Sequence, residues 1–133
     1  MLGKDVSKSY PVGIVGEINY QAAIRCCSVG DTVRIMHEPD NPFDRDALAV
    51  VTDDGDTLGY ISTENWLQSA VHDDHRGCVA KIMEVRSAGD GLLAVVLEVS
   101  TTGHPIETRP YDPVRRSQVL AQPKGCLALL WRL

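Results

Sequence analysis

Residues 31–61, DTVRIMHEPDNPFDRDALAVVTDDGDTLGYI, contain three short apolar segments separated by two turns. Residues 31–38 alternate, with Val33, Ile35 and His37 on one face and Thr32, Arg34, Met36 and Glu38 on the other, which is typical of a strand with one buried face. Residues 47–51 and 57–61 predict two further strands, joined by a hairpin turn at residues 53–56. This stretch therefore predicts neighbouring antiparallel strands.

The loop at residues 38–44, EPDNPFD, has an unusual composition. Its two prolines exclude a helix and a central strand, so it is a rigid, turned loop that presents Phe43 and Asp44 in a fixed geometry. An aromatic ring beside a carboxylate suits a base that stacks and a sugar hydroxyl that donates a hydrogen bond. A second interpretation fits these residues equally well, in which Phe43 plugs the end of a barrel and Asp44 caps the turn.

The segments on both sides of residues 31–61 predict the remaining elements. Residues 12–15 predict a strand, and residues 20–27 predict a short helix with Asn19 as its N-cap. Ser62 or Thr63 would cap a second helix that ends near residues 72–74. Residues 78–86 and 92–100 predict two longer strands with a glycine-containing turn between them. The fold class is mainly β (α+β), a small antiparallel barrel or rolled sheet of about six strands with two short helices.

The domain organisation follows from the 133-residue length and the spacing of prolines. Residues 1–9 form a polar tail, residues 10–102 the barrel domain, and residues 103–133 a C-terminal extension with a short helix at 114–121. The extension ends in an apolar segment, residues 126–131, which we expect to pack on the barrel or on a second subunit as a homo-oligomer contact.

Composition excludes several classes of protein. No apolar run reaches the roughly 18 residues of a membrane span, and the N-terminus lacks the apolar core of a signal peptide. The four cysteines lack the spacing of a disulfide framework, so we expect reduced thiols in a cytoplasmic protein. The net charge of -5 argues against coating nucleic acid through phosphate contacts, so contact with DNA would be local or at a strand end.

Motifs for catalysis, cofactors and metals are weak or missing. Neither nucleotide-loop fingerprint is present and no nucleophile has an assignable partner, so we expect no cofactor and no enzyme activity. His72, His75 and Cys78 are weak metal-ligand candidates, because the paired spacing of a structural zinc site is missing. The arginines of residues 109–116 suit either a phosphate backbone or pairing with acidic side chains.

Five segments together resemble a HIRAN domain, a module found in translocases of DNA repair and in stand-alone bacterial proteins. They are VGEINY (15–20), GD (30–31), HEPDNPFD (37–44), ALAV (47–50) and GYI (59–61), and the resemblance covers about residues 10–100. It implies an OB-like barrel that captures the 3′ end of single-stranded DNA.

Carried over by position, the resemblance also implies a set of DNA-binding residues. Phe43 and Tyr20 would hold the terminal base, and Asp44 would accept a hydrogen bond from the 3′-hydroxyl. Asn41 and Tyr60 would contact the phosphates or the backbone. Apart from the resemblance, Arg45 is predicted as a phosphate contact from its charge, and Asn19 is included among the predicted DNA-binding residues. Two positions depart from the pattern, since Asn19 replaces an aromatic residue and Thr63 replaces a lysine.

The function predicted from sequence is therefore a non-catalytic module that recognises single-stranded DNA 3′ ends or damaged or stalled DNA. A helicase or another DNA-processing protein is the expected protein partner. The alternative is a protein-interaction or regulatory module of the same fold without nucleic-acid binding, because a shared fold does not carry a shared function.

Overall fold

The computed structural model describes residues 8–111. These residues form seven strands, two short α-helices and one 3-10 turn. In chain order they are β1 (Tyr10–Val15), η2 (Glu17–Tyr20), α1 (Gln21–Ile24), β2 (Thr32–His37), β3 (Leu48–Thr52), β4 (Thr57–Ile61), α2 (Trp66–His72), β5 (Gly77–Gly89), β6 (Leu92–Thr102) and β7 (Glu107–Thr108).

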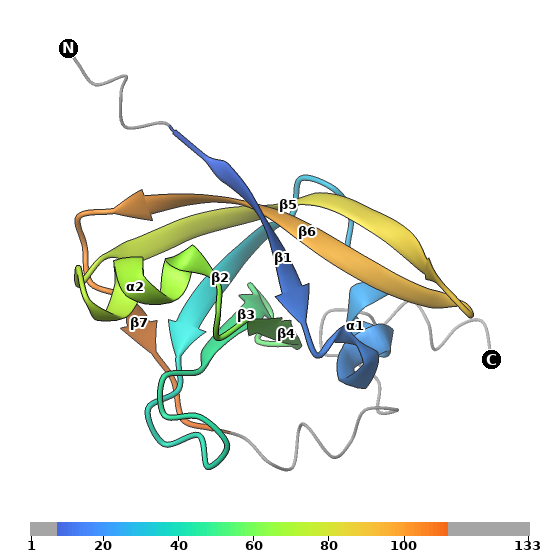
Figure 1. Cartoon of the computed structure of the whole chain (residues 1–133). Coiled ribbons are helices and arrows are strands. Elements are labelled where there is room, and N and C mark those ends of the chain that lie inside the picture. Colours follow the sequence, from blue (N-terminus) through green and yellow to red (C-terminus); the bar gives the residue numbers. More distant parts are fainter. Residues whose placement is uncertain (1–7, 112–133) are drawn as a thin grey trace.

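Six of these strands close into an antiparallel barrel (Figure 1). The strand order is β3-β4-β1-β6-β5-β2, and pairing of β2 with β3 from Val33–Thr52 to His37–Leu48 closes the ring. The two-residue strand β7 adds to β2 in parallel, beside Met36 and His37. The predicted fold class, an OB-like antiparallel barrel with two short helices, is confirmed.

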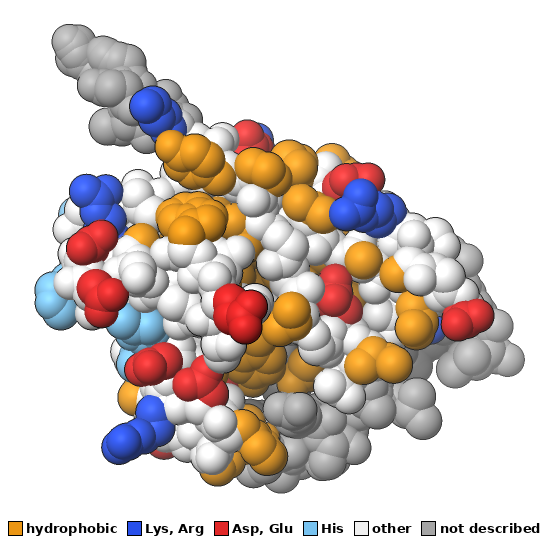
Figure 2. All heavy atoms as spheres, viewed as in Figure 1, with side chains coloured by type: hydrophobic (Ala, Val, Ile, Leu, Met, Phe, Trp, Pro, Cys, Tyr) orange, Lys and Arg blue, Asp and Glu red, His pale blue; other side chains and the backbone are white. Residues whose placement is uncertain are grey.

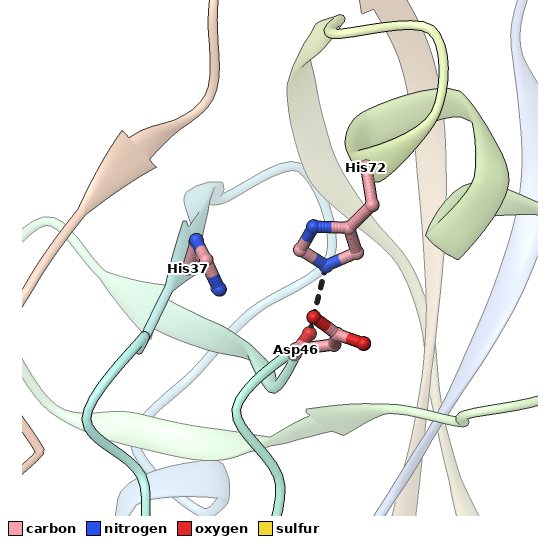
Figure 3. Close-up of side chains that lie close together, drawn as sticks. All are labelled: His37, Asp46 and His72. Atoms are coloured by element: carbon pink, nitrogen blue, oxygen red, sulfur yellow. Dashed lines mark hydrogen bonds between the residues drawn. The ribbon is translucent and has the colours of Figure 1, made fainter.

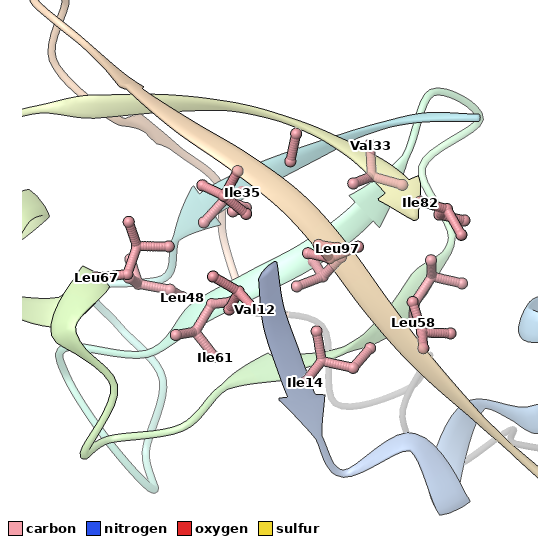
Figure 4. Packing of buried hydrophobic residues seen from close by; sticks show 14 of the residues in the cluster. Val12, Ile14, Val33, Ile35, Leu48, Leu58, Ile61, Leu67, Ile82 and Leu97 are labelled. Atoms are coloured by element: carbon pink, nitrogen blue, oxygen red, sulfur yellow. The ribbon is translucent and has the colours of Figure 1, made fainter. Parts of the chain in front are cut away.

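The barrel interior is filled by residues from all six barrel strands (Figure 4), and these residues alternate along β1, β2, β5 and β6. In β6, for example, Val95, Leu97 and Val99 are at most 1% exposed and the residues between them are half-buried. This is the two-residue period that a strand imposes on its side chains. The helices close the two ends, since α1 contributes Ile24 and α2 contributes Leu67 to the same cluster.

Side chains of η2 and α1 complete the hydrogen bonding of β6 where no strand pairs with it on that side. Gln21 accepts from the backbone N–H of Leu93 and donates to the carbonyl of the same residue, at 2.8 and 3.0 Å. Glu17 accepts from the N–H of Val95 at 3.0 Å. These bonds satisfy backbone groups that would otherwise lie unpaired at a sheet edge.

Both predicted helix starts are wrong. Asn19 lies inside η2, whose N-cap is Gly16 in a left-handed conformation, so Asn19 caps nothing. The second helix begins at Trp66 with Asn65 as N-cap, and the Asn65 side chain accepts from the Leu67 N–H at 2.9 Å. Because Asn and Ser are almost equally good caps, sequence alone does not choose between positions three residues apart.

The β4 glycine of the GYI segment is required by packing. A Cβ atom at Gly59 would lie 2.6 Å from the carbonyl oxygen of Val15 in β1. The backbone of β1 therefore approaches β4 so closely that only glycine fits.

The predictions for the cysteines, for a membrane span and for the C-terminal extension have different outcomes. Cys27 and Cys78 are free thiols as expected, whereas Cys26 is disulfide-bonded, so the expectation of reduced thiols is wrong for that residue. Within residues 8–111 no helix is long and apolar enough to cross a membrane. The predicted helix at 114–121 and the apolar segment at 126–131 lie outside the described residues.

Candidate functional site

The loop between β2 and β3, residues 38–47, begins with a fully buried carboxylate. Glu38 has an exposed fraction of 0% and accepts hydrogen bonds from three side chains. The donors are Nδ2 of Asn41 and the hydroxyl of Tyr60, each at 2.9 Å, and Nε of Arg109 at 2.7 Å. A buried charge is tolerated only when it is paired and hydrogen-bonded, so this set of partners is what allows Glu38 to lie in the interior.

Arg109 is the cation of this cluster and is itself largely buried. Its side chain is 15% exposed, its Nη2 donates to the Thr57 hydroxyl at 2.7 Å, and its backbone N–H donates to the His37 carbonyl at 2.9 Å. Of the two roles considered for the arginines of residues 109–116, Arg109 takes the pairing role, with a buried partner. Arg115 and Arg116 lie outside the described residues.

Asn41 connects Glu38 to the tip of the loop through hydrogen bonds. The Asn41 side chain is buried, and its Oδ1 accepts from the backbone N–H of Phe43 at 2.8 Å and of Asp44 at 3.3 Å. An asparagine that bonds the backbone two and three residues later fixes a tight turn. This turn directs the side chain of Phe43 away from the protein and into solvent.

Phe43 is 74% exposed, so the interpretation in which this ring plugs the barrel end is wrong. Its ring and that of Tyr111 pack in a T-shaped arrangement, with the ring centroids 6.2 Å apart and an interplanar angle of 69°. The helices contribute Ile24 and Leu67 to the barrel core instead.

Asp44 is half-buried beside Phe43 and does cap the turn, as the second interpretation expects. Its Oδ1 accepts from the Asp46 N–H at 2.9 Å. Asp44 also lines a small groove of about 220 Å³ between the loop and α2, together with Thr63 and His72. Asp44 therefore faces the same groove as Thr63, the residue found where the resemblance expects a lysine.

The two tyrosines of the predicted site lie behind the loop. Their ring centroids are 6.4 Å apart, Tyr20 is only 8% exposed, and Tyr60 is half-buried. Burial, followed by the neighbouring Tyr20 and Glu38, raises the pKa of Tyr60 well above its ordinary 10.0, so its hydroxyl stays a donor. Because Tyr20 is buried and Tyr60 is bonded to Glu38, their contact with DNA stays a prediction.

The other predicted residues are distributed around this cluster. Arg45 is exposed on the same loop, and Asn19 is half-buried in η2. The three weak metal candidates do not gather, because among residues 8–111 only His72 belongs to a group of side chains close enough to share an ion. Cys78 lies in β5, where burial raises the pKa of its thiol to about 12, the opposite of what a thiolate ligand needs.

Sequence reasoning missed Glu38, the centre of the cluster, and placed it on the exposed face of its strand. Its principal partner, Arg109, is 71 residues away. The only local indication was a glutamate directly before a proline, and this does not distinguish a buried carboxylate from a solvated one.

Comparison with known proteins identifies the family of this chain. The family model described as HIRAN domain matches residues 10–101. The crystal structure of the HIRAN domain of human HLTF has a TM-score of 0.55 at 18% identity, covering 84% of this chain and 82% of that one. A crystal structure of a protein from Lactobacillus plantarum has a TM-score of 0.52 at 22% identity, covering 69% of this chain and 94% of that one. At these identities the two structures support the fold alone. No curated protein matches the chain.

Proposed function

Because the chain belongs to the HIRAN domain family, whose members are DNA-binding modules, we propose that it is a non-catalytic module that binds the 3′ end of single-stranded DNA. One observation carries the proposal. Phe43 is 74% exposed at the tip of a loop whose conformation is held from inside by Glu38 and Asn41. A rigid, exposed aromatic ring offers a stacking surface for a base without an ordering cost at the moment of binding.

Asp44 supplies the second element of end recognition. One of its carboxylate oxygens is used in the turn, and the other accepts no hydrogen bond from the described residues. That oxygen is suited to a 3′-hydroxyl, which donates a hydrogen bond, and unsuited to a 3′-phosphate, which brings a second negative charge. Single-stranded ends of this kind occur at damaged or stalled DNA, where a helicase or other DNA-processing protein is the partner we propose.

The test is fluorescence anisotropy of two oligonucleotides of one sequence, ending in a 3′-hydroxyl or a 3′-phosphate. We expect the 3′-hydroxyl end to bind more tightly, and Asp44→Ala to weaken that binding by about 1 to 3 kcal/mol, the cost of leaving a polar partner unpaired. Asp53→Ala is the matched control, because Asp53 is an exposed aspartate on the β3–β4 turn and its loss changes the net charge equally. Equal affinity for both ends, or equal effects of the two variants, would contradict end recognition.

A second candidate function is supported by the charge of the groove. Three of its lining residues, Asp44, Asp46 and Asp73, are acidic, and among the described residues no lysine or arginine lines it. An acidic groove favours a protein partner over a polyanion, so a protein-interaction module is the alternative. If DNA is the ligand, two or three phosphate contacts predict a slope of log K against log salt of about -1.4 to -2.1. Absence of binding at low salt, with the fold intact, would favour the alternative.

A further inference from the structure

We propose that His37, Asp46 and His72 form a binding site for one divalent metal ion of the zinc type, which links the β2–β3 loop to α2. One donor atom from each of these residues lies within 4.8 Å of the other two. His37 ends β2, Asp46 lies in the loop, and His72 is the last residue of α2 (Figure 3). The site is thus assembled from three separate elements.

The imidazole rings are already oriented by the loop. Nε2 of His37 lies 2.7 Å from the carbonyl oxygen of Arg45, and Nε2 of His72 lies 2.9 Å from the carbonyl oxygen of Asp46. The two rings meet edge to face, with centroids 4.8 Å apart. The two rings are therefore bonded to adjacent residues of the loop before an ion binds. Because a carbonyl oxygen only accepts, Nε2 of each neutral ring carries the proton, and the lone pair for an ion lies on Nδ1.

The donor set selects the class of ion. Two imidazoles and one carboxylate suit zinc and similar transition-metal ions, whereas magnesium and calcium prefer oxygen ligands alone. Ligands of one tetrahedral zinc ion lie about 3.3 Å apart, given metal–nitrogen distances near 2.0 to 2.1 Å. Donors within 4.8 Å of one another need only a small closing movement, and Asp46 is exposed and able to make it.

The electrostatic surroundings also favour a cation. His72 and Asp46 line the groove that Asp44 and Asp73 share, and no lysine or arginine of residues 8–111 lines it. Figure 2 shows acidic side chains gathered around α2 and the loop, with histidines beside them. An ion here would lower the local negative charge at the groove of the proposed DNA site, although the metal site does not depend on that function.

The experiment is a zinc titration of the full chain, freed of metal with a chelator, followed by calorimetry without DNA. We expect one ion per chain, a rise in melting temperature with zinc, and no such rise with magnesium. His37→Gln and Asp46→Asn should each weaken zinc binding at least tenfold. Glutamine retains a donor for the Arg45 carbonyl, and Asp46 is exposed, so both variants are expected to fold.

The matched controls are the ligands that sequence alone suggested. His75→Asn and Cys78→Ala should leave zinc affinity within twofold, and asparagine tolerates the left-handed conformation of residue 75, whose φ is 58°. Failure of the chain to bind one zinc ion would overturn the proposal. So would full affinity in folded His37→Gln or Asp46→Asn protein, or loss of binding in the two controls instead.

Discussion

The two sides of the β2–β3 loop differ sharply although only Pro42 separates them. On the inner side, Glu38 and Asn41 are at most 4% exposed and have their polar atoms bonded to protein partners. On the outer side, Phe43 is 74% exposed and Asp44 faces a groove. The usual pattern of polar outside and apolar inside is reversed here. The inner side holds the conformation of the loop, and the outer side carries the two residues that we propose for end recognition, Phe43 and Asp44.

The largest expected effect comes from breaking the inner side. Glu38→Ala leaves Arg109, which is 15% exposed, without its carboxylate, and it removes the acceptor of Asn41 and Tyr60. Removing one partner of a buried ion pair costs about 3 to 5 kcal/mol of unfolding free energy. Urea unfolding followed by circular dichroism measures this loss.

Glu38→Gln is the control for the charge, because it keeps the shape and one oxygen acceptor while removing the negative charge beside Arg109. We expect a smaller loss for glutamine than for alanine. A loss below about 1 kcal/mol for Glu38→Ala would mean that the buried cluster does not hold the loop.

Phe43→Ala is the corresponding change on the outer side. Because the ring is 74% exposed, its loss should change the unfolding free energy by no more than about 0.5 kcal/mol. If Phe43 stacks on a base, affinity for single-stranded DNA should fall by about 1 to 3 kcal/mol in the anisotropy assay. Val29→Ala, which also removes an exposed apolar side chain, serves as the control with unchanged affinity. A fall in melting temperature without a fall in affinity would assign Phe43 a structural role.

The smallest effect is expected for Tyr60→Phe, which removes one hydrogen bond to Glu38 and leaves the ring in place. At pH 7 the cost should be about 1.5 kcal/mol, since the acceptor is charged. Above pH 10.0 the phenol ionises in the unfolded chain but not in the folded one, whose pKa is raised. Stability of the original protein should therefore fall as pH rises past 10.0, and the difference from Tyr60→Phe should shrink. Unfolding curves at pH 7 and pH 10.5 test this, and a constant difference would contradict it.

The barrel was predictable because its strands carry a local pattern. Val33 and Ile35 alternate with polar residues, and both are buried in β2. The loop was predictable for the same reason, since Pro39 and Pro42 restrict the backbone whatever surrounds them. Helix starts were less predictable, because Ser62, Thr63 and Asn65 are all suitable caps and only packing of Leu67 into the core selects one.

The candidate site was predictable only on its outer side. Phe43 and Asp44 were identified from their position after two prolines, yet the choice between a ring that plugs the barrel and a ring in solvent needed the structure. The metal-ligand group shows the same limit. His72, His75 and Cys78 are neighbours in sequence, whereas the donors that meet are His37, Asp46 and His72, because a strand end, a loop and a helix end converge there.

The strand periodicity and the rigid loop could be predicted from the sequence, because each depends on residues within a few positions of one another. The family resemblance could be predicted as well, because it depends on residue types and their spacing and not on packing. Three properties could be learned only from the tertiary structure: Glu38 is buried, Arg109 pairs with it across 71 residues, and Phe43 is exposed. Burial and long-range pairing depend on which elements pack together when the barrel closes. The residues around a glutamate in the sequence do not show whether its carboxylate is hydrated or is buried and paired with a distant arginine.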